Sequence, residues 1–147
     1  MKEPTGMTLK DEVLAVLPEA YLEETQHLLE VLRPDGVEVA REPAPGLVMM
    51  EASDCFGTPI HLGEVLVTTA AVRRDGCAGH GSILGDEPAK ALLLACLDLL
   101  DMRELSLARE RLAPHLARLA RRAELSRGLA ARMTGCTRVE FKSMAVE

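Results

Sequence analysis

The chain has 147 residues, 48% of them hydrophobic, and a formal net charge of −6, so we expect one domain over residues 1–147. An acidic chain is a poor match for nucleic acid, whose phosphate backbone is bound by Lys and Arg. No apolar run reaches the roughly 20 residues of a membrane span, so we expect neither nucleic acid nor membrane as a partner.

The first part of the chain predicts two helices. Residues 1–7 are polar, contain Pro and Gly, and are expected to be frayed. Thr8 is a suitable N-cap before an apolar stripe, so a helix should begin there and end at Pro18. Pro18 can open a second helix, because a first helical residue needs no N–H, and the RPDG run at 33–36 should end it. The two helices should form a helical hairpin.

The middle of the chain predicts an antiparallel meander. Short β-rich segments separated by Gly, Pro, Asp and Ser lie at 37–40, 47–50, 59–62 and 64–72. Asp75-Gly76 is a strong hairpin turn signal, so residues 77–84 should pair back on 64–72.

The segment 64–72 begins as an ordinary strand but ends in Ala70, Ala71 and Val72, which leave its last part without a polar face. A strand of this kind is typical of a sheet covered on both sides. We expect a helix at 87–102 on one side and a second element on the other, either a helix of the same chain or a neighbouring subunit.

The last part of the chain returns to helix. Asp86 is the expected N-cap of the helix at 87–102. Another helical pattern follows, which Pro114 should kink or restart, and the TGC run at 134–136 should break it. Residues 137–144 alternate apolar and polar side chains, which predicts a closing strand. The expected fold class is α+β: an antiparallel sheet of four or five strands flanked by helices, with an N-terminal helical hairpin and a C-terminal closing strand.

Charge and cysteines bear on the surroundings of the protein. Residues 1–36 carry eight acids against three bases, whereas 103–132 carry eight Arg against three Glu. This asymmetry suits a protein neighbour or an anionic ligand, and equally two solvated helix faces. The four cysteines are irregularly spaced and follow no signal peptide, so we expect a cytoplasmic protein with reduced thiols.

A glycine-rich stretch resembles a phosphate cradle, with glycines at 76, 79, 81 and 85 before a helix. Its spacing matches neither the P-loop nor the dinucleotide fingerprint. Asp86 and Glu87 lie at the mouth of that helix, where they would repel phosphate. A strand and turn loosened by glycine is the favoured interpretation, with the cradle as the alternative.

A zinc site is the other chemical candidate, with Cys55, His61, Cys77 and His80 as ligands. Cys77 and His80 are three residues apart on a predicted strand, so they should point to opposite faces. We therefore expect no metal. Cys96 lies on the apolar face of its helix, where a small core residue is the favoured interpretation.

Two runs carry a resemblance to a known family: GEVLVTTAAVRRDGCAGHGSILGDEPAKALLLACLDLL (63–100) and TRVEFKSM (137–144). They resemble the PhnG family, the small G subunit of the carbon-phosphorus lyase core complex. The resemblance covers about two thirds of the chain in order. It implies a non-autonomous enzyme subunit that assembles with the I, H and J subunits. With the I and H subunits it would support formation of α-D-ribose 1-methylphosphonate 5-triphosphate from ATP and phosphonate, with release of adenine. It implies no cofactor bound by this chain, while ATP is a substrate of the complex.

The sequence departs from the family pattern at three places. Thr69 stands where the family strand usually carries Arg, Asp86 and Glu87 replace a usual basic residue, and Lys142 replaces a Phe. Fewer cations should weaken a direct hold on a triphosphate, by about 1–3 kcal/mol for each charged hydrogen bond.

The residues expected to lie near a ligand are two arginines and a histidine close to the turn, with two hydroxyl donors: Arg73, Arg74, His80, Thr68 and Thr69. No catalytic residue is assigned. Two other classes remain open: a non-catalytic scaffold for the complex, with a homodimer as the isolated form, and a free-standing binding protein.

Overall fold

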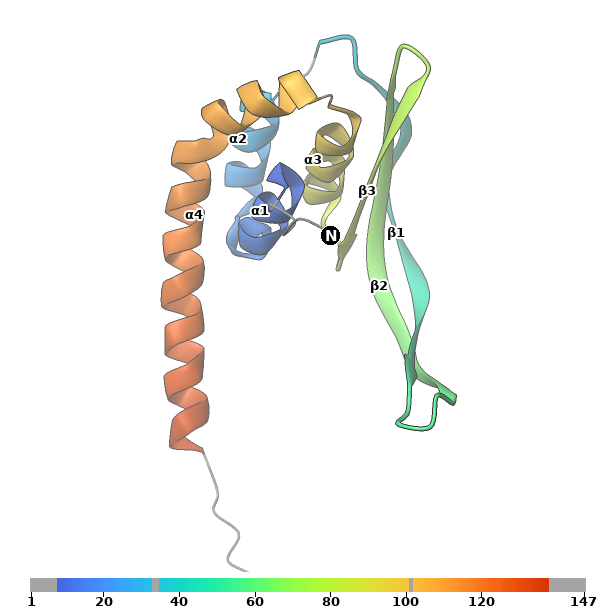
Figure 1. The fold of residues 1–147 in the computed structure, drawn as a ribbon, viewed down its shortest axis with the longest axis vertical. Helices are drawn as coiled ribbons and strands as arrows, with labels where there is room; N and C mark the ends of the chain where they lie inside the picture. The colour runs from blue at the N-terminus through green and yellow to red at the C-terminus, as the bar shows by residue number, and fades with distance from the viewer. Residues whose placement is uncertain (1–7, 33–34, 101, 138–147) are drawn as a thin grey trace, which may run out of the picture.

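The computed structural model describes residues 8–32, 35–100 and 102–137. Its elements are, in chain order, α1 (Leu9–Val16), a 3₁₀-helix (Leu17–Glu19), α2 (Leu22–Leu32), β1 (Glu38–Ser53), β2 (Pro59–Arg74), β3 (Cys77–Leu84), α3 (Pro88–Leu99) and α4 (Met102–Cys136). The strands form one antiparallel sheet in the order β1-β2-β3, with the helices on one side of it (Figure 1). The expected α+β class is confirmed. Residues 1–7, expected to be frayed, lie outside the described part.

The start of α1 is confirmed. Thr8 Oγ1 accepts a hydrogen bond from the Asp11 N–H at 3.2 Å, and Asp11 Oδ2 accepts one from the Thr8 N–H at 3.0 Å. This reciprocal capping box satisfies two N–H groups that the first turn leaves without helical partners. The hydrogen bonds from the Thr8 side chain and backbone lower the pKa of Asp11.

α1 ends at Val16, close to the predicted end at Pro18, but Pro18 does not open the second helix, because it lies in the 3₁₀-helix and α2 begins only at Leu22. The Tyr21 N–H donates to Glu24 Oε2 at 3.0 Å, which anchors the first turn of α2. The helical hairpin is also not matched: α1 and α2 pack mainly on α3 and α4 rather than on each other.

The sheet has three strands in the described part, so the expectation of four or five is wrong there. β1 runs through Pro43 and Pro45, and β2 runs through Gly63, residues that the sequence pattern treats as breaks. β1 is an edge strand, and its ladder with β2 shifts register at three places. Such irregularities admit Pro and Gly without ending the strand. Each pair of short predicted segments is therefore one long strand.

The turn between β2 and β3 is confirmed. Asp75 and Gly76 have φ values of 50° and 83°, as a two-residue hairpin turn of type I′ requires. Arg74 pairs with Cys77 directly beside this turn, and the ladder continues to Val67 and Leu84.

α3 lies very close to β3, and glycine makes this approach possible. A Cβ at Gly81 would overlap the backbone of Ala91, and one at Gly79 would overlap the backbone of Ala95. No other residue leaves room for a helix backbone at this distance. This contact favours the structural interpretation of the glycine-rich stretch over the phosphate cradle.

The predicted ends of α3 need correction. Glu87, not Asp86, is the N-cap residue, and its side chain makes no capping hydrogen bond. The Glu87 N–H instead donates to Thr68 Oγ1 on β2 at 2.9 Å, so the sheet supplies the cap. The helix ends at Leu99 rather than at 102.

α4 is one helix that contains Pro114, so the chain does not restart there. Figure 1 shows that α4 is bent, as expected for a helix with an internal proline. α4 ends at Cys136, so the helix stops within the predicted break at 134–136, although it continues through Gly135. The predicted closing strand at 137–144 lies, apart from Thr137, outside the described residues.

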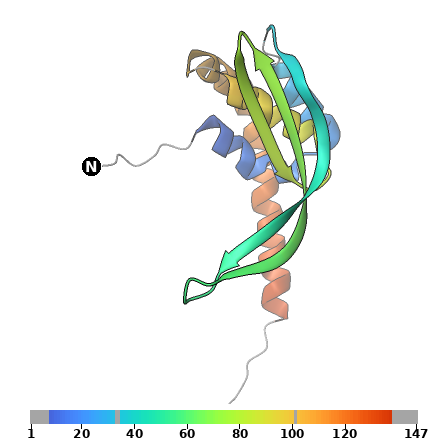
Figure 2. The ribbon, with the colours of Figure 1, turned by 90° about the vertical axis from the view of Figure 1, so that its right-hand side faces the viewer.

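The two-sided burial expected for 64–72 is confirmed at Ala70, Ala71 and Val72, which are all buried, but a covering helix is present on one side only. Thr68, Ala70 and Val72 are buried on the face that packs against α3. The opposite face is turned to the viewer in Figure 2, with the helices behind the sheet. No helix of the described residues covers it, so the alternative of a second helix from the same chain is wrong for this part. The alternative of a neighbouring subunit stays a prediction.

Candidate functional site

The open face of the sheet carries a group of polar side chains. Thr69, Ala71 and Arg73 alternate along β2 with Thr68, Ala70 and Val72, which face α3, so they point away from α3; of these three, Ala71 is buried. Residues directly opposite each other on neighbouring strands share a face. Ala71 pairs with His80 on β3 and with Arg41 on β1, which places the side chains of both on this same open face.

Two guanidinium groups lie on this face, and each has a contact within the chain. Arg41 Nη2 donates to Thr69 Oγ1 at 2.7 Å. Arg73 donates to Glu38 Oε2 from Nη2 at 2.9 Å and from Nε at 3.1 Å. Arg73 and Glu38 are both about two thirds exposed, so this pair contributes little to stability.

The face has the chemistry of an anion-binding surface. Guanidinium groups bind phosphate oxygens through paired N–H donors, and Arg41 and Arg73 supply them. His80 adds an exposed imidazole and Thr69 a hydroxyl. Glu38 offsets part of the positive charge of this face, because its carboxylate forms an ion pair with Arg73.

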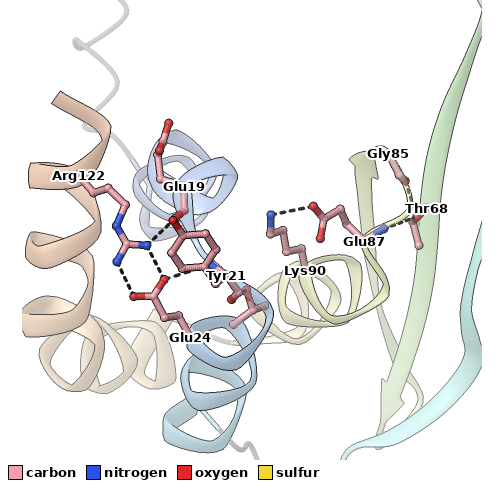
Figure 3. Close-up of polar contacts among 9 residues, drawn as sticks. Glu19, Tyr21, Glu24, Thr68, Gly85, Glu87, Lys90 and Arg122 are labelled. Atoms are coloured by element: carbon pink, nitrogen blue, oxygen red, sulfur yellow. Dashed lines mark hydrogen bonds and ion pairs between the residues drawn. The ribbon is translucent and has the colours of Figure 1, made fainter. Parts of the chain in front are cut away.

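Thr68 does not lie on the open face. It is fully buried, its Oγ1 donates to Gly85 O at 2.5 Å, and the same oxygen accepts the Glu87 N–H (Figure 3). The hydroxyl proton is therefore already used to join β2 to the start of α3. Lys90, one turn further on, is also buried and donates to Glu87 Oε1 at 3.0 Å.

Arg74 also points to the helix side. Its Nη1 and Nη2 donate to Glu104 Oε1 and Oε2 at 2.6 and 2.7 Å, a bidentate pair that joins β2 to α4. Of the five predicted residues, the structure thus places Thr69, Arg73 and His80 on the open face, and Thr68 and Arg74 on the opposite face. Sequence reasoning missed Arg41, because only the register of β1 on β2 reveals that it lies beside Thr69.

Asp98 is a second residue to which sequence reasoning gave no role. Its Oδ2 accepts the backbone N–H of His80 at 2.9 Å, and its Oδ1 accepts Lys10 Nζ at 2.7 Å. Burial raises the pKa of this carboxyl, but the hydrogen bonds from Lys10 and His80 outweigh burial, so the net pKa is lowered. Asp98 therefore ties α3 to α1 and to the edge strand that carries His80.

Ion pairs within the chain account for part of the charge asymmetry of the sequence. Arg122 of α4 donates to Glu24 of α2 through both Nη atoms, at 2.7 and 2.9 Å, and lies over the Tyr21 ring at 4.7 Å (Figure 3). The hydrogen bonds from Arg122 lower the pKa of Glu24. Arg109 pairs with Glu12 of α1 at 2.9 Å. The acidic helices and the basic helix are therefore neighbours in the fold.

The metal candidate has no geometric support in the described part. Within residues 8–32, 35–100 and 102–137, no three His, Cys, Asp or Glu side chains are arranged to hold an ion. Cys55, Cys77, Cys96 and Cys136 are free thiols. Cys96 is buried in the core as expected, and burial raises its pKa. None of the described helices combines the length and the apolar character needed to cross a membrane.

Comparisons with known proteins agree with the resemblance. The family model described as "Phosphonate metabolism protein PhnG" matches residues 9–146. The α-D-ribose 1-methylphosphonate 5-triphosphate synthase subunit PhnG of Rhizobium meliloti (strain 1021) is 36% identical over 102 residues. That alignment covers 67% of this chain, and the chain spans 65% of the length of this curated relative.

Proposed function

Because this chain belongs to the PhnG family of phosphonate metabolism proteins, we propose that it is a non-autonomous subunit of a carbon-phosphorus lyase complex. In that role it supports formation of α-D-ribose 1-methylphosphonate 5-triphosphate from ATP and phosphonate, with release of adenine. The match of the family model over residues 9–146 carries the proposal, and the name of the Rhizobium meliloti relative supports it.

The proposed partners are the I, H and J subunits of the complex, with a homodimer as the form of the isolated chain. ATP is proposed as a substrate of the assembly, and this chain binds no cofactor of its own. The proposed place of action is the cytoplasm, which agrees with the four free thiols.

We propose the open face as the side of this subunit nearest to the ligand. Thr69, Arg73 and His80 would face the triphosphate or the phosphonate, and Thr68 and Arg74 would support the sheet from the other side. Arg41 strengthens this proposal, because its guanidinium contacts Thr69, at the position where the resemblance expects an arginine. A cation from β1 would thus replace one that β2 lacks.

The site proposal predicts that Arg73→Ala lowers kcat/KM for adenine release about 10- to 100-fold, the equivalent of one charged hydrogen bond to the ligand. Glu38→Ala is the matched control, because it removes the same ion pair but keeps the cation. Steady-state adenine release by the reconstituted complex measures both variants. Equal losses in the two would mean that Arg73 acts only through Glu38, which would refute the proposed ligand contact.

The same logic applies at Arg41 and Thr69. Arg41→Ala should lower adenine release more than Thr69→Val does, since both break the 2.7 Å hydrogen bond but only the first removes a charge. Arg74→Ala and Glu104→Ala form the corresponding pair on the helix side. These two should have similar effects, because their bidentate contact joins β2 to α4.

A scaffold without direct ligand contact is the second candidate function. The observation that favours it is that Thr68, Thr69, Arg73 and Arg74 are all engaged by other groups of the same chain. Unchanged adenine release in all the open-face variants, together with intact assembly, would support the scaffold and refute the ligand contact.

Co-purification tests the proposed membership of the complex. The tagged full chain, expressed together with H, I and J type subunits, should be isolated in a stable assembly with them. Recovery of the chain alone, with the other subunits expressed and folded, would favour a free-standing binding protein instead.

A further inference from the structure

Part of the sheet extends beyond the helices that cover the rest of it. β1 and β2 continue together to the turn at 54–58, and we name residues 46–66 the hairpin arm (Figure 1). All its residues are exposed except Asp54 and Val65, which are half-buried. Its large apolar side chains are between 41% and 90% exposed: Leu47, Val48, Met49, Met50, Phe56, Ile60, Leu62 and Leu66.

α4 has a similar extension. After the buried Ala123, every side chain from Glu124 to Cys136 is exposed, and we name residues 124–136 the helical arm. Leu125, Leu129 and Met133 are 75%, 60% and 64% exposed. Because they are four residues apart, they form one apolar stripe along the helix. Exposed apolar surface of this extent is unusual on a monomer and marks an interaction site.

The charges of the two arms are opposite. The hairpin arm carries Glu51, Asp54 and Glu64 and contains no Lys or Arg. The pKa of Asp54 is lowered by the backbone N–H groups of Thr58 and Phe56, so this carboxylate remains ionised. The helical arm carries Arg127 and Arg132 against Glu124, and the exposed Arg121 lies just before it. The two arms therefore carry opposite net charges, and both expose apolar side chains that could pack together.

The arms also match in length and direction. The β1 part of the hairpin arm, 46–53, spans about 26 Å at 3.3 Å per residue. The helical arm spans about 20 Å at 1.5 Å per residue. Both arms project in the same direction from the body of the molecule (Figure 1). A two-fold axis perpendicular to the plane of that view, between the arms, would bring each arm of one copy beside the opposite arm of a second copy.

We propose that the occupant of these surfaces is a second copy of this chain, with the hairpin arm of each copy packed on the helical arm of the other. The contact is isologous, so it occurs twice and closes the assembly at two chains. Each occurrence then needs only about half of the roughly 1,600 Å² buried in a stable interface. This inference rests on the proposed homodimeric form of the isolated chain, and it identifies the two arms as the dimer interface.

One face of the hairpin arm is the expected contact face. Leu47 pairs with Leu66, and Met49 pairs with Glu64, so these four side chains share a face. Leu66 lies two residues from the buried Thr68 on the same strand, so this face continues the one that α3 covers. The partner's helical arm would therefore extend the helical layer along the sheet, and Glu64 would meet its arginines.

The test uses the purified full chain and one variant in each arm, Met49→Lys and Leu129→Glu. Both sites are exposed in the single chain, so each variant should keep the secondary structure of the wild type, and circular dichroism checks this. Sedimentation velocity should show a dimer for the wild type and an increase in the dissociation constant of about tenfold or more for each variant. The matched controls are Leu84→Lys on β3 and Leu107→Glu on α4, whose side chains are 69% and 51% exposed outside the arms. These should dimerise like the wild type.

Mixing the two variants gives the decisive result. In a mixed dimer, the intact helical arm of the Met49→Lys chain meets the intact hairpin arm of the Leu129→Glu chain, and the two altered sites face each other as Lys and Glu. The mixture should therefore regain dimers that neither variant forms alone. Pairing of hairpin arm with hairpin arm would give no such recovery, and that outcome would overturn the proposal.

Two further outcomes would also overturn it. A wild-type dimer whose dissociation constant does not rise with sodium chloride would contradict the charge pairing, because salt screens exposed charges. A chain that is monomeric alone but loses a co-purified synthase subunit on Met49→Lys or Leu129→Glu would assign the arms to a foreign subunit. That last result would leave the proposed role in the synthase intact, whereas loss of the proposed role would show as failure of co-purification by the wild type.

Discussion

The structural roles of individual side chains in this fold depend on contacts with residues that are far away in the sequence. Asp98 is the clearest case, because it accepts hydrogen bonds from Lys10 on α1 and from the backbone of His80 on β3. The second contact covers an N–H on the free edge of the sheet, where an unpaired N–H would otherwise invite another strand. A single carboxylate thus joins two helices and protects an edge.

Asp98 should make the stability of the protein depend on pH. Its pKa is lowered below the ordinary value of 3.8 in the folded chain, so its contribution is present above that pH and is lost as the pH falls through the folded pKa. Urea unfolding should show Asp98→Asn to be less stable than the wild type at neutral pH, with a difference that shrinks in acid. Asp86→Asn, at an exposed side chain, is the control for removal of one carboxylate and should be about as stable as the wild type at neutral pH. A gap between wild type and Asp98→Asn that stays constant down to acid pH would contradict this reading.

At the scale of elements, the contact between α3 and β3 depends on two glycines. Gly81→Ala should lower the free energy of unfolding by about 3 kcal/mol, because the new methyl group would overlap the backbone of Ala91 and force the helix away from the sheet. Gly46→Ala is the matched control on β1, since a Cβ there meets nothing within 4 Å. Chemical denaturation of both variants measures the difference. Equal stability of the two would mean that α3 does not approach β3 as closely as described.

The sequence predicts some elements well and others poorly, for physical reasons. The capping box at Thr8 and the Asp75-Gly76 turn are local, so a few neighbouring residues determine them. The number of strands is not local: Pro43, Pro45 and Gly63 break an isolated strand, but an irregular edge strand accommodates them. The cap of α3 could not be predicted from the local sequence either, because it comes from Thr68 on a different element.

The same distinction applies to the candidate site. Residue types near the turn could be named from the sequence, including Arg73, Arg74 and His80. Arg73 and Arg74 are neighbours on β2, so alternation places them on opposite faces. The register of β3 on β2 pairs His80 with Ala71 and so places it on the face of Arg73. The register of β1 on β2 also adds Arg41, which no pattern near the turn indicates.

At the scale of the whole molecule, the helices pack against one side of the sheet. The other side of the sheet and the two arms are left uncovered. A fold with this much exposed apolar and charged surface is typical of a protein that functions in an assembly. The open face and the arms are separate surfaces. The two proposals are therefore compatible, one placing the open face toward the ligand and the other placing the arms against a second copy.

The central claim, that this chain is a required part of the synthase, is tested most directly by leaving it out. Adenine release from ATP in the presence of methylphosphonate should be measured with H, I and J type subunits, with and without the purified full chain. We predict that adenine release requires the chain and is restored when it is added back. Release at the full rate in its absence would contradict the account.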